Sequence, residues 1–241
     1  MIILFTDYGL QGPYLGQVEA VLSRMAPEQK VITLFPDLPQ HNPKTAAYLL
    51  AAYSAGFPED TIFFCVVDPG VGTLADAPVL LGLDQRWYIG ADNGLFDLVA
   101  RRAVEIECRR IDWRPPQLSS SFHGRDLYAP VCAMLANGVN VPATRQEWRD
   151  RHGWPDDLSE IVYVDAFGNC ITGLRARMIN PDNNLILDDN RTIKHAHTFA
   201  GVPAGQAFRY ENSNGLVEIA VNRNSAQQTL GLNIGSRFSI L

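Results

Sequence analysis

Two aspartates come directly after apolar, strand-like segments of the chain. Asp7 stands in Thr6-Asp-Tyr-Gly9, where an ionised carboxylate can accept the two hydrogen bonds that a ribose cis-diol offers. Asp68 begins Asp68-Pro-Gly-Val-Gly72; a carboxylate leaving an apolar strand is partly desolvated and can position or activate a water. The structural alternatives are that Asp7 caps the next helix or turn and that Asp68 is an ordinary turn residue. Position alone leaves both alternatives open.

Further polar residues lie in the loops that follow. His123, in Ser121-Phe-His-Gly-Arg-Asp126, lies ahead of a helix that Asp126 is predicted to cap, and a histidine there can transfer a proton near neutral pH. A single loop histidine more often has no catalytic role. Asp92 and Asn93 follow another strand and could line the same cleft, although Asp-Asn-Gly is a common turn sequence and the residues alone favour a structural role.

The C-terminal part of the chain carries two candidate base-binding turns. Phe167, in Asp165-Ala-Phe-Gly-Asn169, and Tyr210 could sandwich a flat base, with Asn169 hydrogen-bonding its edge. The alternative is that both segments are hairpin turns with core aromatics. His195 and His197 alternate on a presumed strand, but no third ligand is close by in sequence, so no metal site is predicted.

The elements that must position these residues divide the chain in two. Alternating strand and helix signals in residues 1–141 predict an α/β N-terminal domain with a mostly parallel central sheet, covered by helices on both faces. The loops after Phe5, Val67 and Ile89 fall at the carboxyl ends of predicted strands, where such sheets bind ligands. Residues 142–158 are predicted to be a linker, and the short strands and turn signals of 159–241 predict a small antiparallel barrel or sandwich.

Composition excludes several classes of protein. The 241 residues are 46% hydrophobic and 19% charged, which is enough apolar material for a core and excludes a disordered chain. The net charge is −6 and the Lys and Arg residues are scattered, so we expect no nucleic-acid partner, whereas a cationic small molecule is electrostatically tolerated. We also expect no membrane span and no signal peptide. The four cysteines are isolated from one another, which fits a cytoplasmic protein without disulfides.

Six segments occur in an order that resembles one known family. They are Thr6-Asp-Tyr-Gly9, Val66-Val-Asp-Pro-Gly-Val-Gly72, Asp92-Asn-Gly94, Phe122-His-Gly-Arg-Asp126, Asp165-x-Phe-Gly-Asn169 and Asn212-Ser-x-Gly-x-x-Glu-Ile-Ala-Val221. Together they resemble the S-adenosyl-L-methionine (SAM) hydroxide adenosyltransferases, which are SAM hydrolases related to the SAM-dependent fluorinase and chlorinase. Each motif is weak alone, but the six span nearly the whole chain in register.

The resemblance implies a fold and a reaction. It implies an α/β N-terminal domain, a C-terminal β-barrel domain, and a homotrimer whose active sites lie at subunit interfaces. The implied reaction is attack of water or hydroxide on the ribose C5′ of SAM, giving adenosine and L-methionine, with no metal and no cofactor. Asp68 and His123 match the residues that hold the nucleophile. The residues expected to bind substrate are Asp7, Tyr8, Asp92, Asn93, Asp165, Phe167, Asn169, Tyr210, Ser213, Glu218 and Arg223.

Three positions depart from the family pattern. The family arginine falls at or near Ala75, a family aspartate that helps to hold the methionine end of SAM falls at Gly12, and proline is usual at Ala91. Loss of the arginine removes a cation that would favour hydroxide and orient Asp68. The alternatives to SAM hydrolysis are therefore a non-catalytic or very slow SAM- or adenosine-binding protein and an enzyme acting on another 5′-substituted adenosine.

Overall fold

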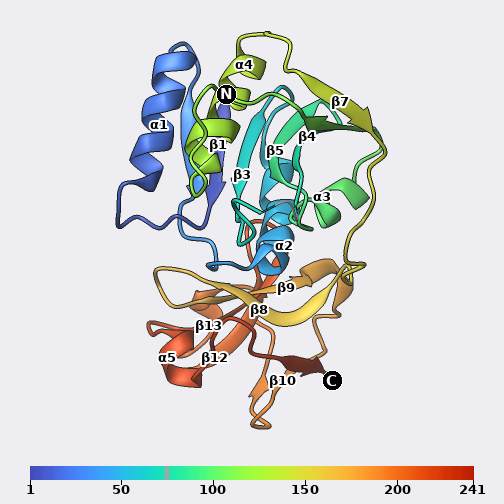
Figure 1. Ribbon diagram of the computed structural model, residues 1–241. Coiled ribbons are helices and arrows are strands. Elements are labelled where there is room, and N and C mark those ends of the chain that lie inside the picture. The colour runs from blue at the N-terminus through green and yellow to red at the C-terminus, as the bar shows by residue number, and fades with distance from the viewer. Residues whose placement is uncertain (74–75) are drawn as a thin grey trace. The chain divides into compact units, whose positions relative to one another are not determined.

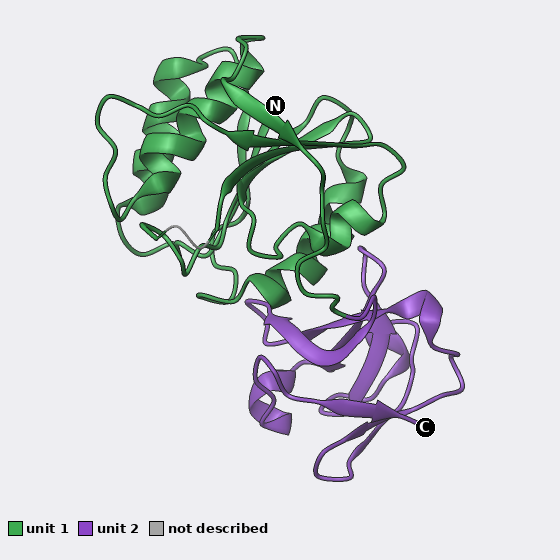
Figure 2. Ribbon diagram, turned by 45° about the vertical axis from the view of Figure 1, so that its right-hand side comes forward, with its two compact units in different colours: residues 1–154 green, residues 155–241 purple. Residues whose placement is uncertain are grey.

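The chain folds into two compact units, residues 1–154 and 155–241 (Figure 2). The computed structural model describes residues 1–73 and 76–241, so the expectation that concerns Ala75 lies outside the described residues. Part of the segment predicted as a linker is strand β7, Ala143–Gln146, which belongs to the sheet of unit 1. The rest of that segment up to Trp154 also clusters with unit 1.

Unit 1 is built on a seven-stranded sheet with the order β2-β1-β3-β5-β4-β6-β7 (Figure 1). Its first four strands in this order are parallel to one another, β4 is antiparallel to both its neighbours, and β7 is antiparallel to β6. Five of the seven strands therefore run in one direction, which confirms the mostly parallel sheet. The strands are β1 Ile2–Thr6, β2 Val31–Phe35, β3 Ile62–Val66, β4 Pro78–Leu83, β5 Arg86–Ala91, β6 Ile106–Ile111 and β7.

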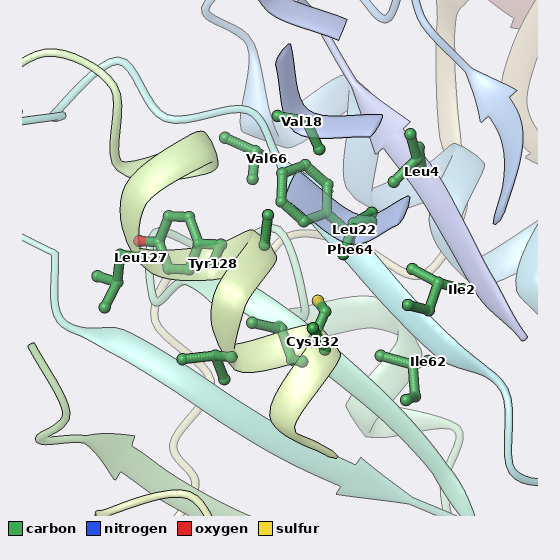
Figure 3. Close-up of a cluster of buried hydrophobic side chains, with 14 of the residues drawn as sticks. Ile2, Leu4, Val18, Leu22, Ile62, Phe64, Val66, Leu127, Tyr128 and Cys132 are labelled. Carbon is green, nitrogen blue, oxygen red and sulfur yellow. The ribbon is translucent and has the colours of Figure 1, made fainter. Parts of the chain in front are cut away.

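Helices cover the sheet on both sides, as predicted. They are α1 Tyr14–Met25, α2 Pro43–Tyr53, α3 Asp97–Arg101 and α4 Ala129–Ala136, with a π-helical turn at Gly124–Tyr128 that leads into α4 and a 3-10 turn at Ser54–Gly56. Alternate side chains of β1 and β3, such as Leu4 and Phe64, pack with Val18 and Leu22 of α1 and Cys132 of α4 (Figure 3).

The opposite face of the sheet packs through aromatic side chains. Phe5 of β1 meets Phe35 at 5.4 Å between ring centroids, and Phe35 meets Tyr53 of α2 at 5.0 Å. Phe63 of β3 stacks on Tyr88 of β5 at 4.8 Å. Every residue of β3 is buried, because side chains on both faces are covered, and this explains its uniformly apolar sequence.

Unit 2 consists of short antiparallel strands around a separate core. One sheet has the order β12-β13-β9-β8 and the other β11-β10-β14. The predicted β-barrel is not confirmed, because the strands of residues 155–241 form these two sheets and no closed sheet. The elements are β8 Leu158–Val164, β9 Cys170–Arg175, β10 Leu185–Leu187, β11 Thr192–Ile193, β12 Ala207–Glu211, β13 Leu216–Val221, α5 Ala226–Leu230 and β14 Phe238–Ile240, with 3-10 turns at Ala176–Met178 and Phe199–Gly201.

Candidate active site

Unit 1 contains a cavity of about 280 Å³ where β1 and β3 end. These strands are parallel neighbours and Thr6 pairs with Val66, so the residues that follow them emerge at the same edge of the sheet. The cavity is lined by Asp7, Tyr8, Tyr14, Gln40, His41, Val66, Asp68, Val71, Ser121, Phe122, His123, Gly124 and Tyr128. The structure thus brings together four of the residues predicted from the sequence: Asp7, Tyr8, Asp68 and His123.

Asp68 is held by the loop that it begins. Its Oδ1 accepts a hydrogen bond from the backbone N–H of Gly70 at 3.1 Å, which is the geometry of a turn. Burial raises the pKa of the Asp68 carboxyl above the ordinary value of 3.8, the Gly70 hydrogen bond opposes this rise, and Asp76 adds to it. The His123 ring acts in the opposite direction and lowers the pKa of Asp68. Asp68 is therefore both a turn residue and a half-buried carboxylate in the cavity.

Asp7 does not cap the following helix. Its Oδ2 accepts the backbone N–H of His41 at 3.0 Å, and α1 begins after Pro13 without a side-chain cap. Burial raises the pKa of Asp7, and the hydrogen bond from His41 opposes the rise. The carboxylate is thus tied to a loop far along the chain and lines the cavity beside Asp68.

His123 stands at the start of the π-helical turn that precedes α4. Asp126 does not cap this element as predicted. It lies inside the turn, where its carboxylate accepts the backbone N–H of Ser119 at 2.9 Å and pairs with Arg125 at 2.6 Å. Insertion of a π turn places His123 at the cavity, and π-helical turns are frequent at functional sites.

Asp92 and Asn93 do not line this cavity. The buried Asp92 carboxylate pairs with Arg151 at 2.5 Å. The buried Asn93 side chain donates to the carbonyl oxygen of Val67 at 2.8 Å and so fixes the residue before Asp68. Binding of substrate by Asp92 and Asn93 stays a prediction. The contacts described above are structural, and a structural role is the one that the sequence alone favoured for these two residues.

A second cavity, of about 670 Å³, lies within unit 2. It is lined by Asp165, Phe167, Asn169, Phe199, Tyr210, Glu218, Val221, Arg223, Asn224 and Ser225, which include six of the seven residues predicted in this half of the chain. The seventh, Ser213, is not among the lining residues, and its hydroxyl accepts a hydrogen bond from Asn214 Nδ2 at 3.1 Å.

Two polar clusters shape this second cavity. Asp165 Oδ1 accepts the backbone N–H groups of Phe167 and Asn169 at 2.9 and 2.8 Å, and Phe167 is 80% exposed. Glu218 is buried and accepts hydrogen bonds from Tyr210 Oη and, at 3.1 Å, from Asn212 Nδ2. Burial raises the pKa of Glu218, and these two hydrogen bonds oppose the rise.

Several lining residues were not predicted. The sequence did not indicate Tyr14 and His41, which line the first cavity. It also did not indicate Phe199 and Ser225, which line the second. His41 comes from a polar loop whose position depends on the tertiary fold. Gly12 has a φ of +113°, which suits glycine and would strain the aspartate that the family pattern expects there.

Two kinds of feature are absent from the part of the chain that the structure describes. Within residues 1–73 and 76–241, no group of three or more His, Cys, Asp and Glu side chains is arranged to hold a metal ion. Over the same residues, no helix has the length and apolar character that crossing a membrane requires.

In unit 1, the first cavity offers a partly desolvated carboxylate, Asp68, and an imidazole, His123, which can orient a water and accept its proton.

The fold and the two cavities define a mixed α/β protein with an acidic, aromatic cavity in one unit and a cavity of aromatic, amide and carboxylate groups in the other. Residues 2–145 match the model of the SAM hydroxide adenosyltransferase N-terminal domain, and residues 159–239 match that of its C-terminal domain. The chain belongs to the SAM hydroxide adenosyltransferase family.

Relatives and solved structures agree with this assignment. The chain is 36% identical to the (R)-S-adenosyl-L-methionine hydrolase of Thermus thermophilus, with 100% of this chain and 99% of the relative covered. It is 32% identical to the protein of the same name from Salinispora tropica, over 98% and 95% of the two chains. An uncharacterised conserved protein from Thermotoga maritima has a similar structure, with a TM-score of 0.89, 28% identity and coverage of 100% and 99%.

Proposed function

We propose that this protein hydrolyses SAM to adenosine and L-methionine by attack of a water-derived oxygen on the ribose C5′. The observation that carries the proposal is that Asp68 and His123 line one cavity and interact electrostatically there. The relatives named (R)-S-adenosyl-L-methionine hydrolase, which cover nearly the whole chain, support the same reaction.

The roles of the two residues follow from the chemistry of a sulfonium. Methionine leaves as a neutral thioether, so the protein mainly has to hold the oxygen in line with the C5′–S bond and exclude other water. Ionised Asp68 accepts a hydrogen bond from the attacking water and orients it. His123 receives the proton that the water loses as the C5′–O bond forms and the C5′–S bond breaks.

The remaining predicted residues are assigned to substrate binding. Asp7 would hold the ribose hydroxyls. Phe167, Asn169, Tyr210 and Ser213 would surround the adenine or methionine groups, and Asp165, Glu218 and Arg223 are further proposed substrate-binding residues. The family resemblance supports a homotrimer in which the first cavity of one subunit and the second cavity of another complete one site. The two domains would be residues 1–141 and 159–241, joined by a linker at 142–158. The protein would be cytoplasmic and would need no cofactor.

The departures at Gly12 and near Ala75 favour testing two alternatives alongside hydrolysis. A protein without the arginine could bind SAM or adenosine without turnover, and one with a changed methionine site could act on another 5′-substituted adenosine. Loss of one electrostatic donor can reduce a rate by ~10²–10³.

The decisive experiment follows products and the source of oxygen. The protein is incubated with each sulfonium epimer of SAM, and separately with 5′-methylthioadenosine, in H₂¹⁸O, and the products are identified by chromatography and mass spectrometry. We expect adenosine that carries one ¹⁸O at the 5′ position, together with unlabelled methionine, from the (R) epimer.

Each alternative has its own signature in the same experiment. Quantitative recovery of unchanged SAM at high protein concentration, with tight binding by calorimetry, would identify a binding protein. Adenosine formed from methylthioadenosine but not from SAM would identify a different substrate. Asp7→Ala should weaken adenosine binding at least tenfold, and unchanged adenosine affinity would remove Asp7 from the ribose.

A further inference from the structure

The first cavity has an unusual balance of charge. It is lined by two carboxylates, Asp7 and Asp68, and none of its described lining residues is a lysine or an arginine. The ionised carboxylates repel each other, since the charge of Asp7 raises the pKa of Asp68. The imidazoles of His41 and His123 also line the cavity and partly oppose the charges of Asp7 and Asp68, respectively. Two partly desolvated carboxylates with no lysine or arginine among the described lining residues favour a ligand that is itself positively charged.

Aromatic rings form much of the rest of the wall. Tyr8 lies 6.0 Å from Tyr14 and 5.7 Å from Phe122, and Tyr14 lies 5.1 Å from Phe122, all between ring centroids. The three rings are tilted or perpendicular to one another, and all three residues line the cavity. The face of an aromatic ring carries negative potential and attracts cations, quaternary onium groups in particular.

Arg125, whose guanidinium lies over the Phe122 ring, is already paired. The Arg125 guanidinium carbon lies 5.2 Å from the Phe122 ring centroid, but the guanidinium is bonded to Asp126 at 2.6 Å and to Gln17 Oε1 at 2.9 Å. Arg125 is not a lining residue, so its charge does not balance Asp7 and Asp68 inside the cavity.

We infer that Tyr14, together with Tyr8 and Phe122, selects ligands that carry a full positive charge next to C5′, by cation–π attraction to the onium centre. The inference rests on the proposed binding of an adenosyl sulfonium in this cavity and specifies what the cavity recognises. It makes Tyr14 a residue that determines specificity between SAM and neutral 5′-thioethers of adenosine. Tyr14 is the most suitable of the three to test, because its side chain is 49% exposed and its replacement leaves the core intact.

The test uses two ligands of equal shape that cannot be hydrolysed. These are 5′-deoxy-5′-trimethylammonioadenosine and 5′-tert-butyl-5′-deoxyadenosine, which differ by one positive charge, and their dissociation constants are measured by calorimetry. We expect the parent protein to bind the cation at least tenfold more tightly, which corresponds to about 1.4 kcal/mol. Tyr14→Leu should reduce this preference at least threefold, and Tyr14→Phe should keep it, because the ring remains.

The controls separate this inference from the proposed reaction. Trp148→Leu removes an aromatic ring from a different surface of unit 1 and should leave the preference unchanged. Equal affinities for the two ligands, no binding of either, or equal weakening of both by Tyr14→Leu would overturn the inference. A Tyr14→Phe variant as defective as Tyr14→Leu would also overturn it and would assign the effect to the hydroxyl. Because neither ligand is a substrate, a protein that fails to hydrolyse SAM can still show the preference.

Discussion

The hydroxyl oxygen of Tyr8 occupies the space that a side-chain carbon at position 124 would need, so Gly124 and Tyr8 pack directly against each other. Tyr8 follows Asp7, and Gly124 follows His123. This contact therefore joins the loop that carries one cavity carboxylate to the turn that carries the cavity histidine. The Tyr8 hydroxyl is buried and has no hydrogen-bond partner among the described residues, which leaves packing as the main role of the contact.

Gly124→Ala should displace Tyr8 or the turn, because the added methyl group overlaps the Tyr8 hydroxyl. We expect a loss of about 1–3 kcal/mol in the free energy of unfolding, typical of overpacking, and a lower turnover. Tyr8→Phe removes the overlapping oxygen, so the double variant should recover most of the lost stability, measured by urea denaturation. A double variant no more stable than Gly124→Ala would show that the clash lies elsewhere.

Asp68→Asn should separate binding from turnover. The amide keeps the shape and loses the charge that orients the water, so kcat should fall by ~10²–10³, a much larger factor than the weakening of SAM binding. Single-turnover kinetics and calorimetry measure the two quantities. Asp188→Asn, at an exposed carboxylate of unit 2, is the matched control. A variant of Asp68 with the parental kcat would move the nucleophile-binding role to another residue.

The pH dependence of turnover should report on Asp68. Burial raises the pKa of its carboxyl, so the ionised form that orients water is lost on acidification at a pH above the ordinary carboxyl value of 3.8. We therefore expect kcat to rise with pH on the acid side as Asp68 ionises, at a pH above 3.8, and we expect Asp68→Asn to lose this contribution to the profile. If the pH profile of Asp68→Asn has the same shape as the parental profile, the rise in kcat on the acid side belongs to another group.

Asn93→Leu should impair turnover without a contact to substrate. The change removes the hydrogen bond to the Val67 carbonyl and leaves a buried acceptor unpaired, which costs about 1–3 kcal/mol of stability. Asp68 directly follows Val67, so loss of this bond should disturb the position of the Asp68 carboxylate. We therefore expect kcat to fall while KM stays near the parental value. Asn137→Leu removes an exposed bond of the same kind, from Nδ2 to the carbonyl oxygen of Met25, far along the chain from Asp68, and should leave kcat unchanged. Equal losses of kcat in both variants would point to a general effect on stability.

Asp97→Asn should flatten the dependence of stability on pH. Burial raises the pKa of Asp97 to about 6, and Asp150 adds to the rise, while hydrogen bonds from Arg151 and His152 oppose it. The folded state therefore binds this proton more tightly than the unfolded state. The resulting stabilisation is fully present below about pH 4 and is lost as the pH rises through 6, a change on the order of 3 kcal/mol. Denaturation at pH 4 to 7 measures the free energy of unfolding, with Glu28→Gln, at an exposed residue, as the control. If the free energy of unfolding changes with pH equally in the parent and in Asp97→Asn, the prediction is wrong.

Some features of this protein were determined by the sequence alone. The apolar run of β3 predicted a strand buried on both faces, and the Asp68, His123 and Asp165 motifs predicted which loops carry polar groups of the two cavities. These predictions succeed because burial and turn chemistry act over a few neighbouring residues. Strands β6 and β7 were not predicted, since β6 contains charged residues and pairs only with partners far along the chain.

Only the tertiary structure decided how the polar groups combine. Asp92 was grouped with Asp68 by position after a strand, yet the fold pairs it with Arg151. Tyr14 reaches the first cavity from the start of α1 and His41 reaches it from a loop, and neither has a motif of its own. Position 124, at the start of the π turn, has no room for a side chain because the Tyr8 hydroxyl occupies that space. Contacts of this kind join residues tens of positions apart, and they form because side chains must fill a common core and pair their buried charges, which local patterns do not encode.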